Sequence, residues 1–297
     1  MQSRPIYDAF MHTGGENGLP LTLQSGDNHI KNNVTMLNGT KAFIPSDKLK
    51  VYHNVRARSL LAGEILFDCE IPGLRENRRL AFDFDIKAAR DIPPDVLFEF
   101  VRATHEVVCK FFPKNYADIV SNVFARQAYE KTDTVNGTKV KYVKIGLHVY
   151  TNTIVSYEKA AQITVGVQMY LERAFPVGYS ILNPWSEIVD NQILKNGLRL
   201  PGSCKCDPCP CTKSTVKSQF VCSQCHDRQK VTSHRSYNFY YSLNSQGEIF
   251  VPDYKTNYGS FLADTCMMIP QDQKMYPPKE GFKIPIGCRE WVDDRDD

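Results

Sequence analysis

The sequence predicts a mixed α/β fold, and three features indicate it. Short runs that alternate apolar and polar residues, typical of strands, lie at 79–86, 140–150 and 237–243. Two longer segments, 93–112 and 157–175, carry apolar residues at helical spacing. Because strand, helix, strand and helix follow one another along the chain, we expect an α/β or α+β core in which helices flank a sheet.

The N-terminal part is the least regular. Residues 1–50 are rich in Gly, Asn, Thr and Ser, which predicts an irregular arm with at most a short element. An apolar run at 59–71 predicts a strand before the one at 79–86. Pro93-Pro94-Asp95 then predicts the start of the first helix, because proline is tolerated in the first turn.

The C-terminal half contains a cysteine-rich interruption. Asn136-Gly137 predicts a turn before the strand at 140–150, and 197–201 predicts a short strand that leads into the cysteines. We therefore expect a catalytic core made of 51–203 and 236–275, with a zinc-binding insert at 204–235 between its two parts. The Pro/Lys-rich and acidic end, 276–297, predicts a tail or linker.

Composition restricts the class of protein. The 297 residues are 42% hydrophobic and 23% charged, with a net charge of +3, which is ordinary for a globular protein. No run of 18 apolar residues and no signal peptide is present, so we expect no membrane association. Six of the ten cysteines lie within 204–225, which favours a metal site in an intracellular, reducing compartment over a disulfide scaffold.

The paired aspartates at 83 and 85 are the most informative acidic residues. In a strand, residues two apart share a face, so Phe82 and Phe84 would enter the core while Asp83 and Asp85 project together on the other side. Two adjacent carboxylates repel each other, and Mg²⁺ or Mn²⁺ would remove that repulsion. The alternative is a solvated strand face, although aspartate is disfavoured in strands.

A second strand carries a cation, a glycine and a histidine on one face. Lys144, Gly146 and His148 alternate with apolar residues. The lysine and the histidine can donate to phosphate oxygens, and the glycine lets a ligand approach the backbone closely. The alternative is an ordinary half-exposed strand with a hydrogen-bonded histidine.

A third acid precedes a basic run. Asp190 follows two apolar residues and could complete a three-carboxylate metal site, while Lys195, Arg199 and Lys205 could bind a triphosphate or a template. A surface loop with scattered charges is the alternative.

Three elements then occur in a fixed order, and together they carry a resemblance. They are Phe82-Asp83-Phe84-Asp85, then Lys144-x-Gly146-x-His148, then Val189-Asp190 followed by Gly197-Leu198-Arg199-Leu200-Pro201-Gly202-Ser203. Across 79–205 the chain resembles the archaeo-eukaryotic primase superfamily, in particular the primase domains of large DNA viruses and primase-polymerases. Many members have Ser or Thr in place of Gly146, where a backbone N–H could replace the hydroxyl contact.

The resemblance implies a DNA primase or primase-polymerase domain with an RRM-like palm sheet flanked by helices. It implies two catalytic Mg²⁺ or Mn²⁺ ions on Asp83, Asp85 and Asp190. It further implies a site for the triphosphate of an NTP or dNTP, on a single-stranded DNA template. The residues implied for that triphosphate are Lys144, Gly146, His148, Arg199 and Lys205.

The cysteine cluster predicts a structural Zn²⁺ site. Cys206-x2-Cys209 and Cys222-x2-Cys225 have the spacing of a zinc ribbon or knuckle, in which paired thiolates reach one tetrahedral ion. The ligand set stays open, because Cys204, Cys211, His226 and His234 are substitutes. Nearby lysines and arginines favour contact with a nucleic-acid backbone.

Two other classes of protein are compatible with the same residues. A metal-dependent nuclease would use the same carboxylates but needs no triphosphate site, and a zinc-ribbon module would bind nucleic acid without catalysis. No phosphate-binding Gly-x4-Gly-Lys-[Ser/Thr] loop occurs, so we expect helicase activity, if needed, from a partner module or from replisome proteins.

Overall fold

The structure, a computed structural model, describes residues 34–35, 41–64, 66, 68–70, 77–112, 118–135, 137–175, 180–206, 231–232 and 236–269. The chain divides into two compact units. Unit 1 comprises 1–74, 196–238 and 253–273, and unit 2 comprises 75–195, 239–252 and 274–297. The core predicted at 51–203 and 236–275 includes parts of both units.

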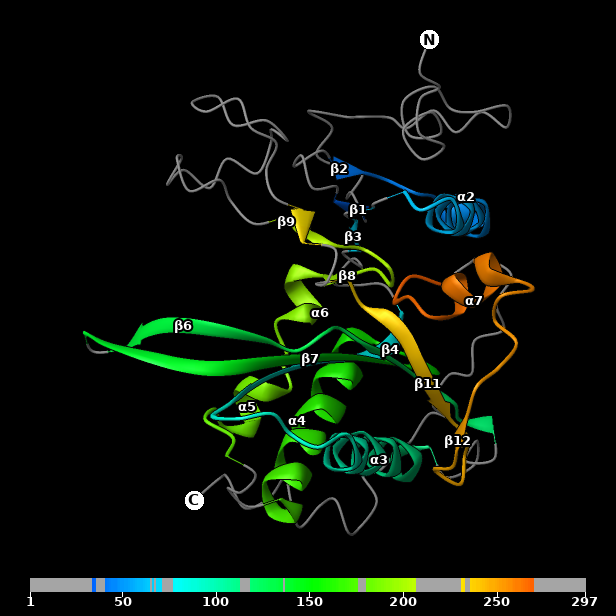
Figure 1. Ribbon diagram of the computed structural model, residues 1–297. Helices are drawn as coiled ribbons and strands as arrows, with labels where there is room; N and C mark the ends of the chain where they lie inside the picture. Colours follow the sequence, from blue (N-terminus) through cyan, green and yellow to red (C-terminus); the bar gives the residue numbers. More distant parts are fainter. Residues whose placement is uncertain are drawn as a thin grey trace, which may run out of the picture. The chain divides into compact units, whose positions relative to one another are not determined.

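Unit 2 is built on an antiparallel sheet flanked by helices, which confirms the predicted mixed α/β class. Its strands follow the order β12-β11-β5-β7-β4, and β6 pairs with β7 (Figure 1). The strands are β4 (Arg78–Ala88), β5 (Ser121–Ala125), β6 (Tyr129–Val135), β7 (Thr138–Val155), β11 (Asn238–Leu243) and β12 (Ile249–Phe250).

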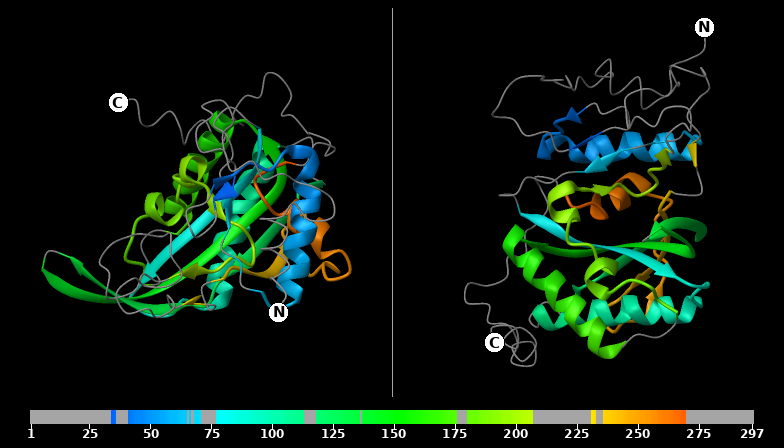
Figure 2. Two further views of the ribbon diagram at one scale, coloured as in Figure 1. Left: turned by 90° about the horizontal axis from the view of Figure 1, so that it is seen from above. Right: turned by 90° about the vertical axis from the view of Figure 1, so that its left-hand side faces the viewer.

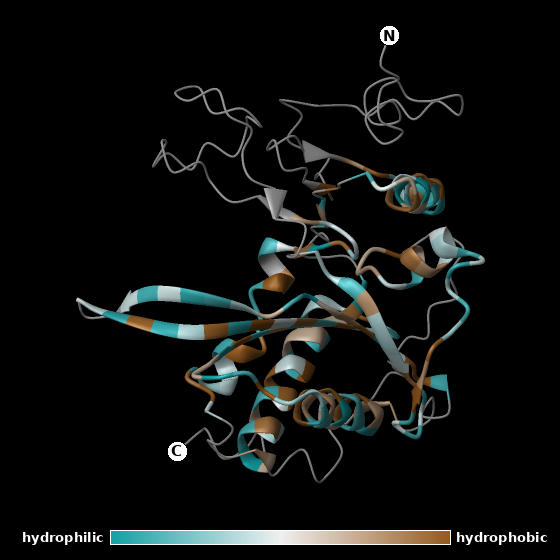
Figure 3. Ribbon diagram, viewed as in Figure 1, coloured by the Kyte–Doolittle hydropathy of each residue, from teal (hydrophilic) through white to brown (hydrophobic). Residues whose placement is uncertain are grey.

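The long strand β7 organises this sheet. It pairs with β4 along one edge and with β5 and then β6 along the other. Gly137, with φ of +78°, lies in the turn between β6 and β7, where the sequence predicted one. The hairpin projects beyond the helices of unit 2 (Figure 1), and β6 is largely hydrophilic (Figure 3).

Two amphipathic helices cover one face of the sheet. The helices α3 (Pro94–Phe111) and α4 (Tyr157–Ala174) match the predicted segments and lie on the same side of β4 and β7 (Figures 1 and 2). Ser156 caps α4 by accepting a hydrogen bond from the Lys159 N–H at 3.3 Å. Both helices alternate between hydrophobic and hydrophilic residues (Figure 3), and their apolar sides bury Phe82 and Phe84 completely.

The outer edge of β4 is covered by the segment 180–190, which contains α5 (Trp185–Ile188). The Ala89 N–H donates to the Ser180 carbonyl, and the Leu182 N–H donates to the Lys87 carbonyl, both at 2.8 Å. This segment satisfies backbone groups that an open sheet edge would leave unpaired. It also carries Asp190 along the strand that bears Asp83.

Unit 1 contains a small sheet of order β2-β1-β3-β8 and a two-stranded pair, β9 and β10. Its helices are α2 (Leu49–Leu61), preceded by the 3₁₀ turn Ser46–Lys48, and α7 (Tyr258–Asp264). The strands are β1 (Val34–Thr35), β2 (Lys41–Ala42), β3 (Cys69–Glu70), β8 (Leu198–Arg199), β9 (Lys205–Cys206) and β10 (Val231–Thr232).

The strand predicted at 59–71 is wrong at its start. Ser59–Leu61 forms the last turn of α2, and among the described residues of this run only Cys69–Glu70 is a strand. The buried side of α2 includes Tyr52, Arg56 and Ser59, so polar residues occupy positions where the helical pattern requires apolar ones. Among the described residues, no helix is both long and apolar enough to cross a membrane.

Candidate functional site

Asp83 and Asp85 lie side by side on β4. Strand alternation places them on one face and buries Phe82, Phe84 and Ile86 on the other, as predicted. The two carboxylate side chains keep exposed fractions of 21% and 35%, so both are accessible. The acids therefore lie on the face of the sheet opposite to the one that α3 and α4 cover.

The register of β7 brings the predicted basic residues to these acids. Asp83 pairs with His148, Asp85 pairs with Gly146, and each pair points to the same face. The Lys144 ammonium lies 2.7 Å from Asp85 Oδ2, and His148 Nε2 lies 3.4 Å from Asp83 Oδ1. His148 is only 1% exposed, so it is buried against an acid and is not the half-exposed histidine of the alternative reading.

A second cation, which the sequence did not predict, lies at Asp85. Arg126 follows β5, and its Nη2 lies 3.0 Å from Asp85 Oδ1. The backbone N–H of Arg126 donates to the Gly146 carbonyl at 3.2 Å. The Arg126 guanidinium lies 5.5 Å from the centre of the Tyr129 ring. No local pattern marks this arginine, because the strand before it was not predicted either.

This arrangement gives a physical reason for glycine at position 146. Gly146 lies between Asp85 on one neighbouring strand and Arg126 on the other. A side chain on that face would project into the space through which the guanidinium reaches the carboxylate. Because residue 146 has no side chain, it places no atoms on that face between the two partners of the ion pair.

The backbone of Asp190 pairs with the strand that carries Asp83 and Asp85. Its N–H donates to the Asp83 carbonyl at 2.9 Å, next to a bridge between Phe84 and Val189. Its Oδ1 accepts a hydrogen bond from the Gln192 N–H at 2.8 Å. Burial raises the pKa of Asp190, and the negative charges of Asp83 and Asp85 raise it further, whereas the Gln192 N–H lowers it.

Two amide side chains that the sequence did not mark as functional hold the segment that carries Asp190. Asn183 accepts from the Lys87 N–H at 2.9 Å and donates to the Asp85 carbonyl at 3.0 Å, as a paired strand would. Gln168 on α4 donates to the Val189 carbonyl at 2.7 Å. The bonds of Asn183 hold the segment 180–190 against β4, and the bond of Gln168 holds the same segment against α4.

The three acids are donors of the type that binds divalent cations. Three carboxylates supply the hard oxygen ligands that Mg²⁺ and Mn²⁺ prefer, and their mutual repulsion is the penalty that a cation would remove. Within the part of the chain that the structure describes, no three His, Cys, Asp or Glu side chains already form a group able to hold a metal ion. Asp85 instead has both carboxylate oxygens on cations, Arg126 and Lys144.

The other predicted site residues belong to unit 1. Arg199 lies on β8 with its guanidinium 4.8 Å from the centre of the Tyr237 ring. The backbones of Lys205 and Cys206 form β9, but their side chains lie outside the described residues, as do Cys209, Cys211, Cys222, Cys225, His226 and His234. Cys204 is buried, and burial raises the pKa of its thiol.

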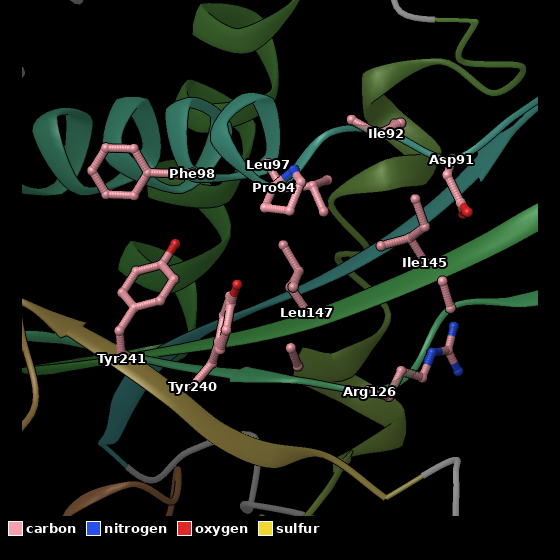
Figure 4. Close-up of a pocket in the computed structure, with 12 residues that line it drawn as sticks. Asp91, Ile92, Pro94, Leu97, Phe98, Arg126, Ile145, Leu147, Tyr240 and Tyr241 are labelled. Carbon is pink, nitrogen blue, oxygen red and sulfur yellow. The ribbon is translucent and has the colours of Figure 1, made fainter.

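A small pocket lies on the opposite face of the unit 2 sheet (Figure 4). Its walls come from α3 (Leu97, Phe98), β7 (Ile145, Leu147) and β11, whose Tyr240 and Tyr241 rings both point toward the helix. Ile145 and Leu147 alternate with Lys144, Gly146 and His148, so the pocket and the acids use opposite faces. Arg126 belongs to both, because it lines the pocket and pairs with Asp85.

Comparison with known proteins adds no family to this geometry. No protein-family model matches the chain, and no curated protein matches it.

Proposed function

We propose that this chain is the catalytic domain of a DNA primase or primase-polymerase. In this proposal it joins nucleotides on a single-stranded DNA template by metal-dependent nucleotidyl transfer. The observation that carries the proposal is the position of Asp190. It is far from Asp83 in sequence, yet it is hydrogen-bonded to that residue and repelled by both strand acids.

The charge arrangement favours polymerisation over other uses of three acids. Lys144 and Arg126 lie on the same face as the carboxylates and supply two positive charges at one end of the cluster. A nuclease needs the acids but not a site for a triphosphate, so these cations favour an enzyme that takes a nucleoside triphosphate. Arg199 and Lys205 are proposed as further phosphate contacts from the sequence alone.

The residues have separate roles in the proposed mechanism. Asp83, Asp85 and Asp190 would hold divalent cations, which when bound activate a 3′-hydroxyl and neutralise the departing pyrophosphate. Lys144 stabilises negative charge on the phosphates, and Arg126 orients the Asp85 carboxylate. His148 contacts Asp83 and holds it on the face where the nucleotide binds.

The finer fold assignment belongs to the same proposal. The antiparallel sheet with helices on one face is compatible with an RRM-like palm, in which β4 and β7 carry the catalytic residues. We also propose that 204–235 is a structural Zn²⁺ insert that grips template or primer. Zinc content of the purified protein tests this, because Cys206→Ser and Cys222→Ser should each lower it.

A primer-synthesis assay tests the function. The protein is incubated with single-stranded DNA, Mn²⁺ or Mg²⁺ and labelled NTPs or dNTPs, and products are resolved by length. Asp83→Asn should lower incorporation by about a hundredfold or more, because a metal ligand that stabilises the transition state is lost. Asp133→Asn is the matched control, since Asp133 is a half-buried acid of β6 in the same sheet that pairs with Lys131, and its loss should leave incorporation unchanged.

The same assay separates the competing functions. Degradation of labelled DNA without incorporation would replace the primase with a metal-dependent nuclease. If wild type and Asp83→Asn bind the DNA equally well and neither extends nor degrades it, the chain is a nucleic-acid-binding module without catalytic activity.

A further inference from the structure

The ion pairs of Asp85 differ in how firmly each cation is held. Arg126 holds Oδ1 at 3.0 Å, and its side chain is only 4% exposed. Its backbone bond to Gly146 and its position over Tyr129 fix both ends of the residue. Removing this guanidinium from Asp85 would therefore require the surrounding structure to move.

Lys144 holds the other oxygen in a different way. Its ammonium is 2.7 Å from Asp85 Oδ2, and its side chain is 17% exposed at the end of a flexible stem. An ammonium ion is strongly hydrated and can rotate to a new partner at small cost. A divalent cation that needs Oδ2 therefore competes with Lys144 and not with Arg126.

We propose that Lys144 is an exchangeable counter-ion of Asp85. Without a divalent cation it neutralises Oδ2, and when a cation takes that oxygen, Lys144 moves to the phosphates of the incoming nucleoside triphosphate. Arg126 stays on Oδ1 as a positioning residue that keeps Oδ2 directed toward the cation. This inference rests on the proposed function, because it assumes that Asp83, Asp85 and Asp190 bind a divalent cation.

The exchange couples two binding events. A lysine on Asp85 weakens the cation site until a triphosphate draws it away, so each ligand helps the other to bind. A site of this kind would take up a cation most readily together with its nucleotide.

Mn²⁺ binding to the full chain without nucleotide, measured from the electron paramagnetic resonance of free Mn²⁺, tests the exchange. Lys144→Gln should bind Mn²⁺ about tenfold more tightly than wild type, because the competing charge is gone. Lys144→Arg, which keeps the charge, should stay near wild type. Lys87→Gln is the matched control, since Lys87 pairs with Lys144 across the strands but lies over the Tyr142 ring. The Mn²⁺ affinity of the Lys87→Gln variant should differ from that of wild type by less than about threefold.

A second readout must move in the opposite direction. With Mn²⁺ saturating, Lys144→Gln should bind a fluorescent nucleoside triphosphate about tenfold more weakly, because the lysine no longer reaches the phosphates. A lysine with a merely structural role would weaken both ligands or neither. Circular dichroism melting of each variant checks that the fold is intact.

The possible failures are distinguishable. If Lys144→Gln binds Mn²⁺ no more tightly than wild type while Asp83→Asn loses it, the exchange is wrong and the proposed metal site stands. If neither wild type nor Lys144→Gln binds Mn²⁺ in a manner that depends on Asp83, the proposed function and the exchange fall together.

Discussion

The N–H of Asp190 donates a hydrogen bond to the carbonyl of Asp83 at 2.9 Å, so the third acid is placed by the backbone of the strand that carries the first two. The fold therefore holds the negative charge of Asp190 close to those of Asp83 and Asp85, where the charges repel one another. Burial and two neighbouring carboxylates raise the pKa of Asp190, which means that its negative charge opposes folding near neutral pH.

Asp190→Asn should separate activity from stability. We expect primer synthesis to be lost, while the free energy of unfolding without divalent cations rises because a repelled charge is removed. The gain should be largest above the raised pKa of Asp190, should shrink as the pH falls below it, and should vanish below the ordinary pKa of an unfolded aspartate. Urea unfolding at several pH values measures this, and a lower stability at neutral pH would contradict it.

Gln168→Leu should loosen the segment that carries Asp190. The buried Val189 carbonyl loses its donor at 2.7 Å, which should cost about 1–3 kcal/mol of unfolding free energy. We expect kcat to fall roughly tenfold with little change in KM, because Asp190 is displaced. Gln162→Leu, at an exposed position of the same helix, is the control and should stay within about 0.5 kcal/mol of wild type.

His105 should make unit 2 sensitive to acid. It is buried in α3 with its Nδ1 2.8 Å from Ser121 Oγ, and burial lowers its pKa below the usual 6.5. The unfolded chain therefore takes up the proton first, so the unfolding free energy is full above pH 6.5 and falls as the pH drops toward the folded pKa. His105→Gln should show a flatter fall below about pH 6.5, and an unchanged slope would refute this role.

Asp68→Asn should destabilise unit 1 strongly. Arg56 Nε lies 3.0 Å from Asp68 Oδ2, both side chains are at most 1% exposed, and Tyr52 also donates to Asp68. Removing one partner of a buried pair costs about 3–5 kcal/mol. Asp47→Asn provides the contrast, because its contact with Lys48 is exposed and should cost less than about 1 kcal/mol in urea unfolding.

Local patterns were enough to predict the parts of the site that lie on regular strands. The alternation at 82–86 and 143–149 gave the correct faces for Asp83, Asp85 and His148, because side-chain direction in a strand depends only on position. Asp190 lies outside a regular strand. It was predicted from the two apolar residues before it, and the resemblance to the primase superfamily then implied the same role.

The missed features depend on tertiary contacts. Arg126 reaches Asp85 over Gly146, and Gln168 acts on a segment beyond its own helix, so neither has a local signature. The strand β6 was missed because Glu130, Lys131 and Asp133 give it no apolar face, and pairing with β7 in a hairpin stabilises it instead. The helix α2 was not predicted because it buries polar residues such as Arg56 and Ser59, which break the apolar pattern of an amphipathic helix.

A crystal of the full chain soaked with Mn²⁺ and a nucleoside triphosphate tests the central claim most directly. The anomalous signal should place Mn²⁺ on the carboxylates of Asp83, Asp85 and Asp190, with the triphosphate beside Lys144. Mn²⁺ bound elsewhere, or a triphosphate bound away from these three acids, would contradict the account.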